Sequence, residues 1–170
     1  VIDRRSVDTE SKNKVALYCA VLKRENFELV VQKAVECGVA AIVPVISSRT
    51  IKLGVKLDRL QKIATEACEQ SGRGIVPEIV EPMSLRLAIV HAKSNATNFL
   101  FEPGSPPFDP TASAPSNLPA GLFIGPEGGW DPSELDLMRA ANFTAANLGP
   151  RILRAETAAI VATFMATSHA

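Results

Sequence analysis

The sequence predicts an α/β domain with a mostly parallel β-sheet flanked by helices. Short runs of β-branched and other apolar residues alternate with amphipathic segments of helical period, which is the pattern of repeated βαβ units. The 170 residues, 46% apolar and 21% charged, suffice for one domain of ordinary size. This apolar content excludes a disordered chain, and the apolar runs are far shorter than the ~20 residues of a membrane span.

The first half of the chain predicts two strand–helix units. The apolar run 15–22 predicts a buried strand, and Asn26 is a candidate cap for a helix that ends at Gly38. A second strand is expected over 39–46, where a proline favours an edge position or a bulge. A second amphipathic helix is expected over 56–70.

The second half continues the alternation around one long loop. Residues 103–120 contain six of the twelve prolines and predict a flexible, Pro-rich surface loop. A helix that runs to about Ala141 has a strong start, because Asp131 is followed by proline and then by a glutamate three residues after the cap. The other expected elements are strands over 76–80, 98–101, 121–124 and 143–148, a short helix opened by Ser84 and a closing helix from Glu156 to about Thr167.

The charge is unevenly distributed along the chain. The net charge of zero argues against a simple nucleic-acid binder, which normally has a basic surface. However, residues 1–75 contain 13 basic and 9 acidic residues, whereas residues 76–170 contain 5 and 9. The basic first half therefore hints at a polyanionic partner.

The cysteines and histidines exclude some chemistry. The three cysteines lie in apolar stretches without CxxC spacing, which favours a reducing, cytoplasmic setting. With only His91 and His169 available, we expect no metal site and no histidine-based catalytic triad.

Three predicted strands end in loops that suit a binding site, at 101–104, 125–129 and 149–151. In an open α/β sheet, ligands bind outside the carboxyl ends of the strands. No nucleotide-binding glycine motif is present, and the charge of Glu127 would repel a phosphate. A ligand without phosphate, such as a cationic one, fits better; the alternative is a tight turn that leads into a capped helix.

Four motifs in order then resemble one family. From the amino to the carboxyl end they are QKAVECGV (32–39), EACEQSGR (66–73), LFIGPEGG (122–129) and LGPRILRAETA (148–158). Together they resemble the RsmE family of the SPOUT superfamily, the small-subunit (16S) ribosomal RNA uridine-N3 methyltransferases. The resemblance implies a SPOUT-type sheet with a C-terminal deep trefoil knot, S-adenosyl-L-methionine (SAM) as methyl donor, and a homodimer formed through the knot region. It also implies small-subunit rRNA as partner, and we expect neither a metal nor a membrane to take part.

The resemblance also implies roles for individual residues. Arg154 and Glu156 are the candidate catalytic residues; Glu156 could equally be a helix-dipole residue, and no residue is a clear general base. The candidate cofactor-binding residues are Leu100, Phe101, Glu102, Ile124, Gly125, Pro126, Glu127, Gly128, Gly129, Leu148, Gly149, Ile152 and Leu153. The candidate RNA-binding residues, which could also be plain surface charge, are Lys23, Arg24, Arg49, Gln70, Ser71 and Arg73.

Family members carry a PUA-like RNA-binding domain before the catalytic domain. We therefore expect residues 1–14 to be a linker remnant of such a domain, and residues 15–170 to form the SPOUT methyltransferase domain. Two alternatives to rRNA methylation stay open, namely a SPOUT methyltransferase acting on tRNA, and a SAM-binding domain without catalysis.

Overall fold

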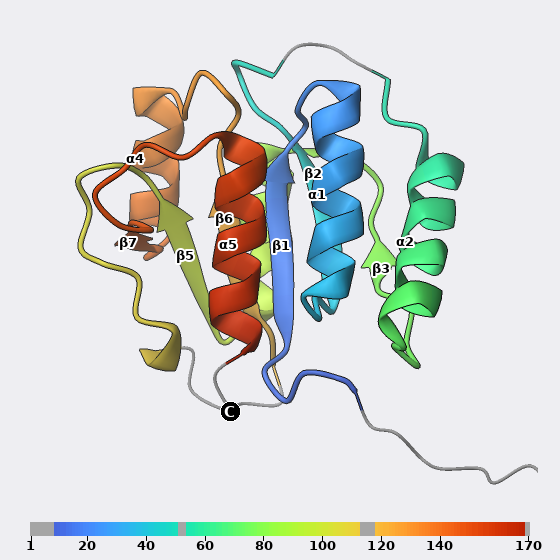
Figure 1. The fold of residues 1–170 in the computed structure, drawn as a ribbon. Helices are drawn as coiled ribbons and strands as arrows, with labels where there is room; N and C mark the ends of the chain where they lie inside the picture. The colour runs from blue at the N-terminus through green and yellow to red at the C-terminus, as the bar shows by residue number, and fades with distance from the viewer. Residues whose placement is uncertain (1–8, 51–53, 113–117, 169–170) are drawn as a thin grey trace, which may run out of the picture.

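The computed structural model describes residues 9–50, 54–112 and 118–168, and these residues form a parallel α/β fold. The sheet has seven strands in the order β3-β2-β1-β6-β5-β7, with β4 also paired to β2, and each described strand pair is parallel. Two long strands at the centre, β1 and β6, are wholly buried (Figure 1). The predicted mostly parallel sheet flanked by helices is thus confirmed.

The strands and helices alternate along the chain, and most predicted elements are present. The strands are β1 (Val15–Ala20), β2 (Ala41–Ile46), β3 (Glu78–Ile79), β4 (Met83–Ser84), β5 (Thr97–Phe101), β6 (Ala120–Ile124) and β7 (Thr144–Ala146). The helices are α1 (Arg24–Glu36), α2 (Leu57–Ser71), α3 (Leu85–His91), α4 (Pro132–Ala140) and α5 (Ala155–Thr167), with short 3-10 helices η1 (Ala92–Ser94) and η2 (Pro110–Ala112).

Helices cover both faces of the sheet. Helices α1, α2 and α5 pack on one face, where residues such as Val30, Leu60 and Ala159 meet the sheet. Helices α3 and α4 cover the opposite face, where Leu85 and Met138 are buried. Burial on both faces explains why β1 reads as a continuous apolar run rather than an alternating one.

Two local predictions are corrected. Helix α1 begins at Arg24 with Lys23 at the N-cap position, three residues before the predicted cap, so Asn26 does not cap it. Strand β2 is an interior strand despite Pro44. The proline is tolerated because β3 pairs only with residues 41–42 and β4 only with 45–46, so the outer ladder is interrupted at 43–44.

The long proline-rich loop is anchored to the core through Phe108. Phe108 is buried, and its ring makes edge contacts with Phe99 and Phe101. The Phe108 amide also donates to the carbonyl of Asn147, 2.8 Å away. The loop is therefore not purely a surface feature, although residues 113–117, part of the predicted flexible segment, lie outside the described residues.

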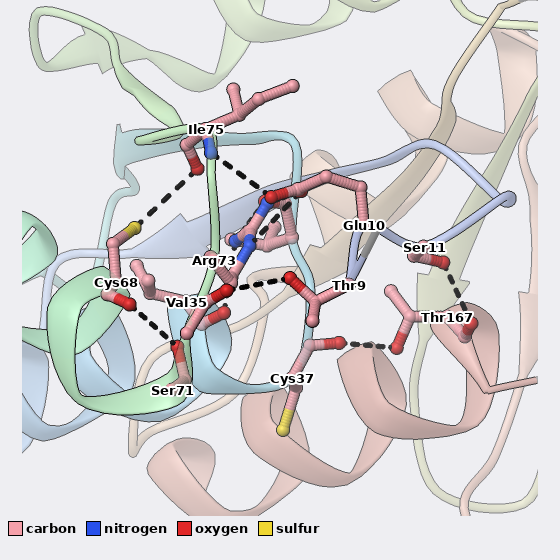
Figure 2. A network of polar contacts seen from close by, with 12 residues as sticks. Thr9, Glu10, Ser11, Val35, Cys37, Cys68, Ser71, Arg73, Ile75 and Thr167 are labelled. Atoms are coloured by element: carbon pink, nitrogen blue, oxygen red, sulfur yellow. Dashed lines mark hydrogen bonds and ion pairs between the residues drawn. The ribbon is translucent and has the colours of Figure 1, made fainter. Parts of the chain in front are cut away.

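The segment that precedes β1 is bound to the carboxyl ends of two helices, α2 and α5 (Figure 2). The Thr9 hydroxyl donates to Gly72 O beyond α2, and the Ser11 hydroxyl donates to Thr167 O in α5, both over 2.8 Å. Glu10 pairs with Arg73 at 2.6 Å. The described part of the predicted linker, residues 9–14, thus lies against the domain; residues 1–8 are outside the described residues.

Candidate active site

The three candidate loops lie at one edge of the sheet. They follow β5, β6 and β7, which are parallel neighbours in the sheet. Leu100 is in register with Phe123, and Phe101 with Ala146, so the three strands end at nearly the same level. The structure thereby brings together the predicted cofactor-binding segments 100–102, 124–129 and 148–153.

The loop after β6 is a tight turn in which the structure favours glycine at two positions. The Gly129 amide donates to Pro126 O over 2.8 Å, and Gly129 has φ +70°. A Cβ on Gly125 would lie 3.1 Å from Nε1 of the buried Trp130, so this position is crowded. The turn exposes Glu127 and places its backbone at the end of the sheet.

The start of α4 is fixed by a capping box that also binds a second loop. The Asp131 side chain accepts from Ser133 N, and the Asp131 amide donates to Glu134 Oε2 over 2.9 Å. The other oxygen of the buried Glu134 accepts from Ser48 N over 2.7 Å. The capping box was predicted from the sequence, whereas the contact between Glu134 and the loop after β2 was not.

The loop after β7 is bound to the proline-rich loop. The Asn147 amide donates to Pro106 O over 2.8 Å, and the Asn147 side-chain oxygen accepts from Gly149 N over the same distance. Gly149 has φ +110°, which explains the glycine at this position. Ile152 in the same loop is 88% exposed.

An acidic cluster lies on the α5 side of these loops. Glu156, in the first turn of α5, is buried, and its Oε2 atom has no hydrogen-bond partner among the described residues. Burial, and then the charges of Glu127 and Glu156, raise the pKa of the Cys19 thiol. Both carboxylates therefore act on the end of β1, next to the candidate loops. Arg154, at the N-cap position of α5, is exposed.

Three of the predicted RNA-binding residues lie at this same edge. Lys23 and Arg24 follow β1, and the Lys23 amide is 3.4 Å from Glu127 Oε1. The Arg49 guanidinium, which follows β2, donates to Gly128 O over 2.7 Å. Arg49 thus links the loop after β2 to the glycine-rich turn.

The other predicted RNA-binding residues, Gln70, Ser71 and Arg73, lie elsewhere. Gln70 and Ser71 are the last residues of α2, and Arg73 follows the helix at the opposite edge of the sheet. Ser71 and Arg73 lie close to the segment before β1 (Figure 2). The Arg73 side chain is only 5% exposed and donates to Glu10, Val35 O and Val39 O. Its guanidinium is therefore committed to intramolecular contacts, which argues against the predicted RNA contact.

Residues 9–167 match the sequence profile of the RNA methyltransferase domain. The chain belongs to this RNA methyltransferase domain family. A relative from Mesomycoplasma hyopneumoniae, ribosomal RNA small subunit methyltransferase E, is 34% identical over 166 residues, which cover 94% of this chain and 72% of that protein. The protein of the same name from Synechocystis is 34% identical over 169 residues, 95% of this chain and 55% of that protein.

A solved structure shares the fold of this RNA methyltransferase domain. Ribosomal RNA small subunit methyltransferase E from Neisseria gonorrhoeae, bound to S-adenosyl methionine, superposes with a TM-score of 0.84 at 35% identity. The match covers 94% of this chain and 67% of that one. The resemblance identified from the four motifs is thus confirmed.

The described residues contain neither a candidate membrane-spanning helix nor a candidate metal centre. No helix among them is long and apolar enough to cross a bilayer. No group of three or more histidine, cysteine, aspartate or glutamate side chains in the same part of the chain is placed to hold a metal ion.

Proposed function

We propose that this chain is the catalytic domain of a SAM-dependent methyltransferase that modifies N3 of a uridine in small-subunit (16S) ribosomal RNA. The observation that carries the proposal is the match of nearly the whole chain to relatives named ribosomal RNA small subunit methyltransferase E. The structure of one such relative contains S-adenosyl methionine. The uridine N3 position rests on the resemblance to the RsmE motifs.

The described residues fit the chemistry of SAM. SAM is cationic at sulfur and carries no phosphate. The candidate site presents two carboxylates, the exposed Glu127 and the buried Glu156, and Oε2 of Glu156 has no hydrogen-bond partner among the described residues. A buried carboxylate oxygen without a donor is costly unless a ligand or water supplies one. We propose that the backbone of 125–129 and 148–153, with 100–102, holds the ligand, which supplies an electrophilic methyl group.

Arg154 and Glu156 are the proposed catalytic residues. The N3 proton of uridine must leave so that the nitrogen lone pair can attack the methyl carbon. The exposed guanidinium of Arg154 is free to approach a bound base and to stabilise its negative charge. The Glu156 carboxylate sits in the first turn of α5, two residues away along the chain, and would orient the base or the cofactor.

Binding and turnover test this function separately. Calorimetry with SAM should show binding, and small-subunit rRNA from a strain lacking its own enzyme should accept a labelled methyl group at uridine N3. Arg154→Ala should reduce turnover strongly and SAM affinity much less. The absence of SAM binding would refute the proposal, and methylation of tRNA alone would reassign the substrate. SAM binding without methyl transfer would leave only a binding domain.

Assembly, chain path and location are part of the proposal. Ile152, in the loop before α5, is 88% exposed, and Phe164, on α5, is 57% exposed. These exposed apolar side chains suit a homodimer formed through this region.

We propose that the chain forms a deep trefoil knot here, since α5 returns from the edge strand β7 to pack on β1, β6 and α1. The free cysteines of the described residues suit a cytoplasmic protein.

A further inference from the structure

A groove lies between the amino-terminal ends of α1 and α2, beside the candidate active site. It is open to solvent and is lined by residues that follow β1, by the first turns of α1 and α2, and by the residues just before α2. Its floor is apolar and is formed by Val21, Leu22, Phe27, Val55 and Leu60.

The rim of the groove is basic. Arg24, Lys56 and Arg59 line it, against a single carboxylate, Glu28. The Arg59 guanidinium donates to Glu28 Oε2 over 2.7 Å, and Arg24 Nε donates to Glu28 Oε1 over 3.0 Å. The hydrogen bond from Arg59 is the main cause that lowers the pKa of Glu28 to about 2. Glu28 is therefore ionised at neutral pH and orients both arginines, while the rim keeps an excess of positive charge.

Both helix starts favour an anion at this rim. The N-cap positions of α1 and α2 are Lys23 and Lys56, and neither makes a side-chain capping hydrogen bond. Side chains that accept a hydrogen bond are preferred there, and a cation is unfavourable at the positive end of a helix dipole. Glu25 and Asp58, in the first turns, offset part of this charge but do not line the groove.

The groove adjoins the glycine-rich turn after β6. Val21 and Leu22 directly follow β1, whose Cys19 is in register with Ile124 of β6. The amide of Lys23, at the groove's edge, is 3.4 Å from Glu127 Oε1 in that turn. A polymer strand that enters the candidate active site could therefore continue into the groove.

We infer that this groove binds a nucleotide of the single-stranded RNA segment next to the methylated uridine. The base would lie on the apolar floor, and Arg24, Lys56 and Arg59 would contact the flanking phosphates, as in other sites for single-stranded nucleic acid. This inference rests on the proposed function, because it assumes that RNA is the substrate.

The test measures RNA affinity directly, with a short fluorescent single-stranded oligouridylate and fluorescence anisotropy. The double variant Lys56→Gln/Arg59→Gln removes two charges from the rim. The matched control, Arg86→Gln/Lys93→Gln, removes two exposed charges from α3 and η1, which are not part of the groove. Each single-strand phosphate contact contributes a salt slope of about 0.7, so two lost contacts should weaken binding about 25-fold at roughly 0.1 M salt and lower the slope by about 1.4.

A second variant tests the floor without changing charge. Val55→Trp should fill the groove and weaken binding while leaving the salt slope unchanged. Circular dichroism and thermal unfolding verify that each variant is folded. The inference is overturned if the rim variant, correctly folded, binds no more weakly than the control, or if Val55→Trp binds RNA like the wild type.

The RNA measurement separates this inference from the proposed function. If the wild-type chain methylates no RNA but the rim variant still loses RNA affinity, the result would support RNA binding in the groove and refute the proposed methyltransferase activity. If the rim variant transfers methyl groups normally with an unchanged KM for rRNA, RNA binding in the groove would be refuted and the proposed function would stand.

Discussion

Arg73 offers the sharpest test of structure against sequence resemblance. The EQSGR motif led us to expect an RNA contact, but the structure places the guanidinium inside the domain, 95% buried, where it joins the segment before β1 to α1 (Figure 2). We predict that Arg73→Met, which keeps the aliphatic length but removes the charge, destabilises the fold.

The size of the effect follows from the contacts. The guanidinium donates to Glu10 over 2.6 and 3.2 Å, and to Val35 O and Val39 O over 3.0 and 2.9 Å. Breaking a buried ion pair costs about 3–5 kcal/mol. Glu10 is 23% exposed and can regain water, so we expect the lower end, about 3 kcal/mol of unfolding free energy. For a chain of this size that corresponds to a fall in Tm of about 6–12 °C.

Urea and thermal denaturation measure this loss, with Lys33→Met as the matched control. Lys33 forms a pair with Glu36 near the surface, with the two side chains 39% and 26% exposed, so its loss should cost about 1 kcal/mol or less. A double-mutant cycle with Glu10→Gln isolates the pair itself. If Arg73→Met unfolded at the wild-type temperature but bound RNA more weakly, the structural role would be wrong and the RNA contact would be restored.

Three further predictions concern stability, each checked by denaturation. Gly121→Ala should cost about 1–3 kcal/mol, because the added Cβ would clash with Asn98 Oδ1, whose side chain is held by hydrogen bonds to Asn95 and Ala92 O; an unchanged Tm would contradict this. Asp131→Ala should cost about 1 kcal/mol by removing the α4 cap, and a neutral result would show that the cap is dispensable. Burial alone would raise the pKa of Glu10, but the hydrogen bond and charge of Arg73 lower it. The stability from this pair should therefore be full above about pH 4.3 and be lost in more acidic solution, so the difference in stability between the wild type and Arg73→Met should become smaller at low pH.

The fold was predictable where burial is continuous. The runs that form β1 and β6 are wholly buried, so their apolar composition reflects their environment directly. The short strands were harder. The predicted strand over 76–80 pairs only at Glu78–Ile79, and Met83–Ser84 was not predicted to pair at all. The two-residue strands β3 and β4 are defined by their pairing with β2, which depends on tertiary contacts and not on the local sequence.

The candidate loops were also predictable, because parallel strands end at one edge of the sheet. The partners of individual charged residues were not. Glu10 and Arg73 are 63 residues apart, and Ser48 and Glu134 are 86 apart, so no local pattern connects them. A sequence motif indicated that Arg73 is special, but only its burial and contacts separate a structural role from a binding role.

The same distinction explains the basic charge of the first half of the chain. The guanidinium of Arg73 is buried and paired, so it contributes little to the outer electrostatic surface. Arg24 and Arg59 share one carboxylate, and no carboxylate of the described part of the chain pairs with Lys56. Five basic residues of the first half, Lys23, Arg24, Arg49, Lys56 and Arg59, lie at the edge of the sheet that also carries the glycine-rich turn. If RNA binding arose from the overall charge instead, the rim variant and its control would weaken it equally; a selective loss in the rim variant would locate it in the groove.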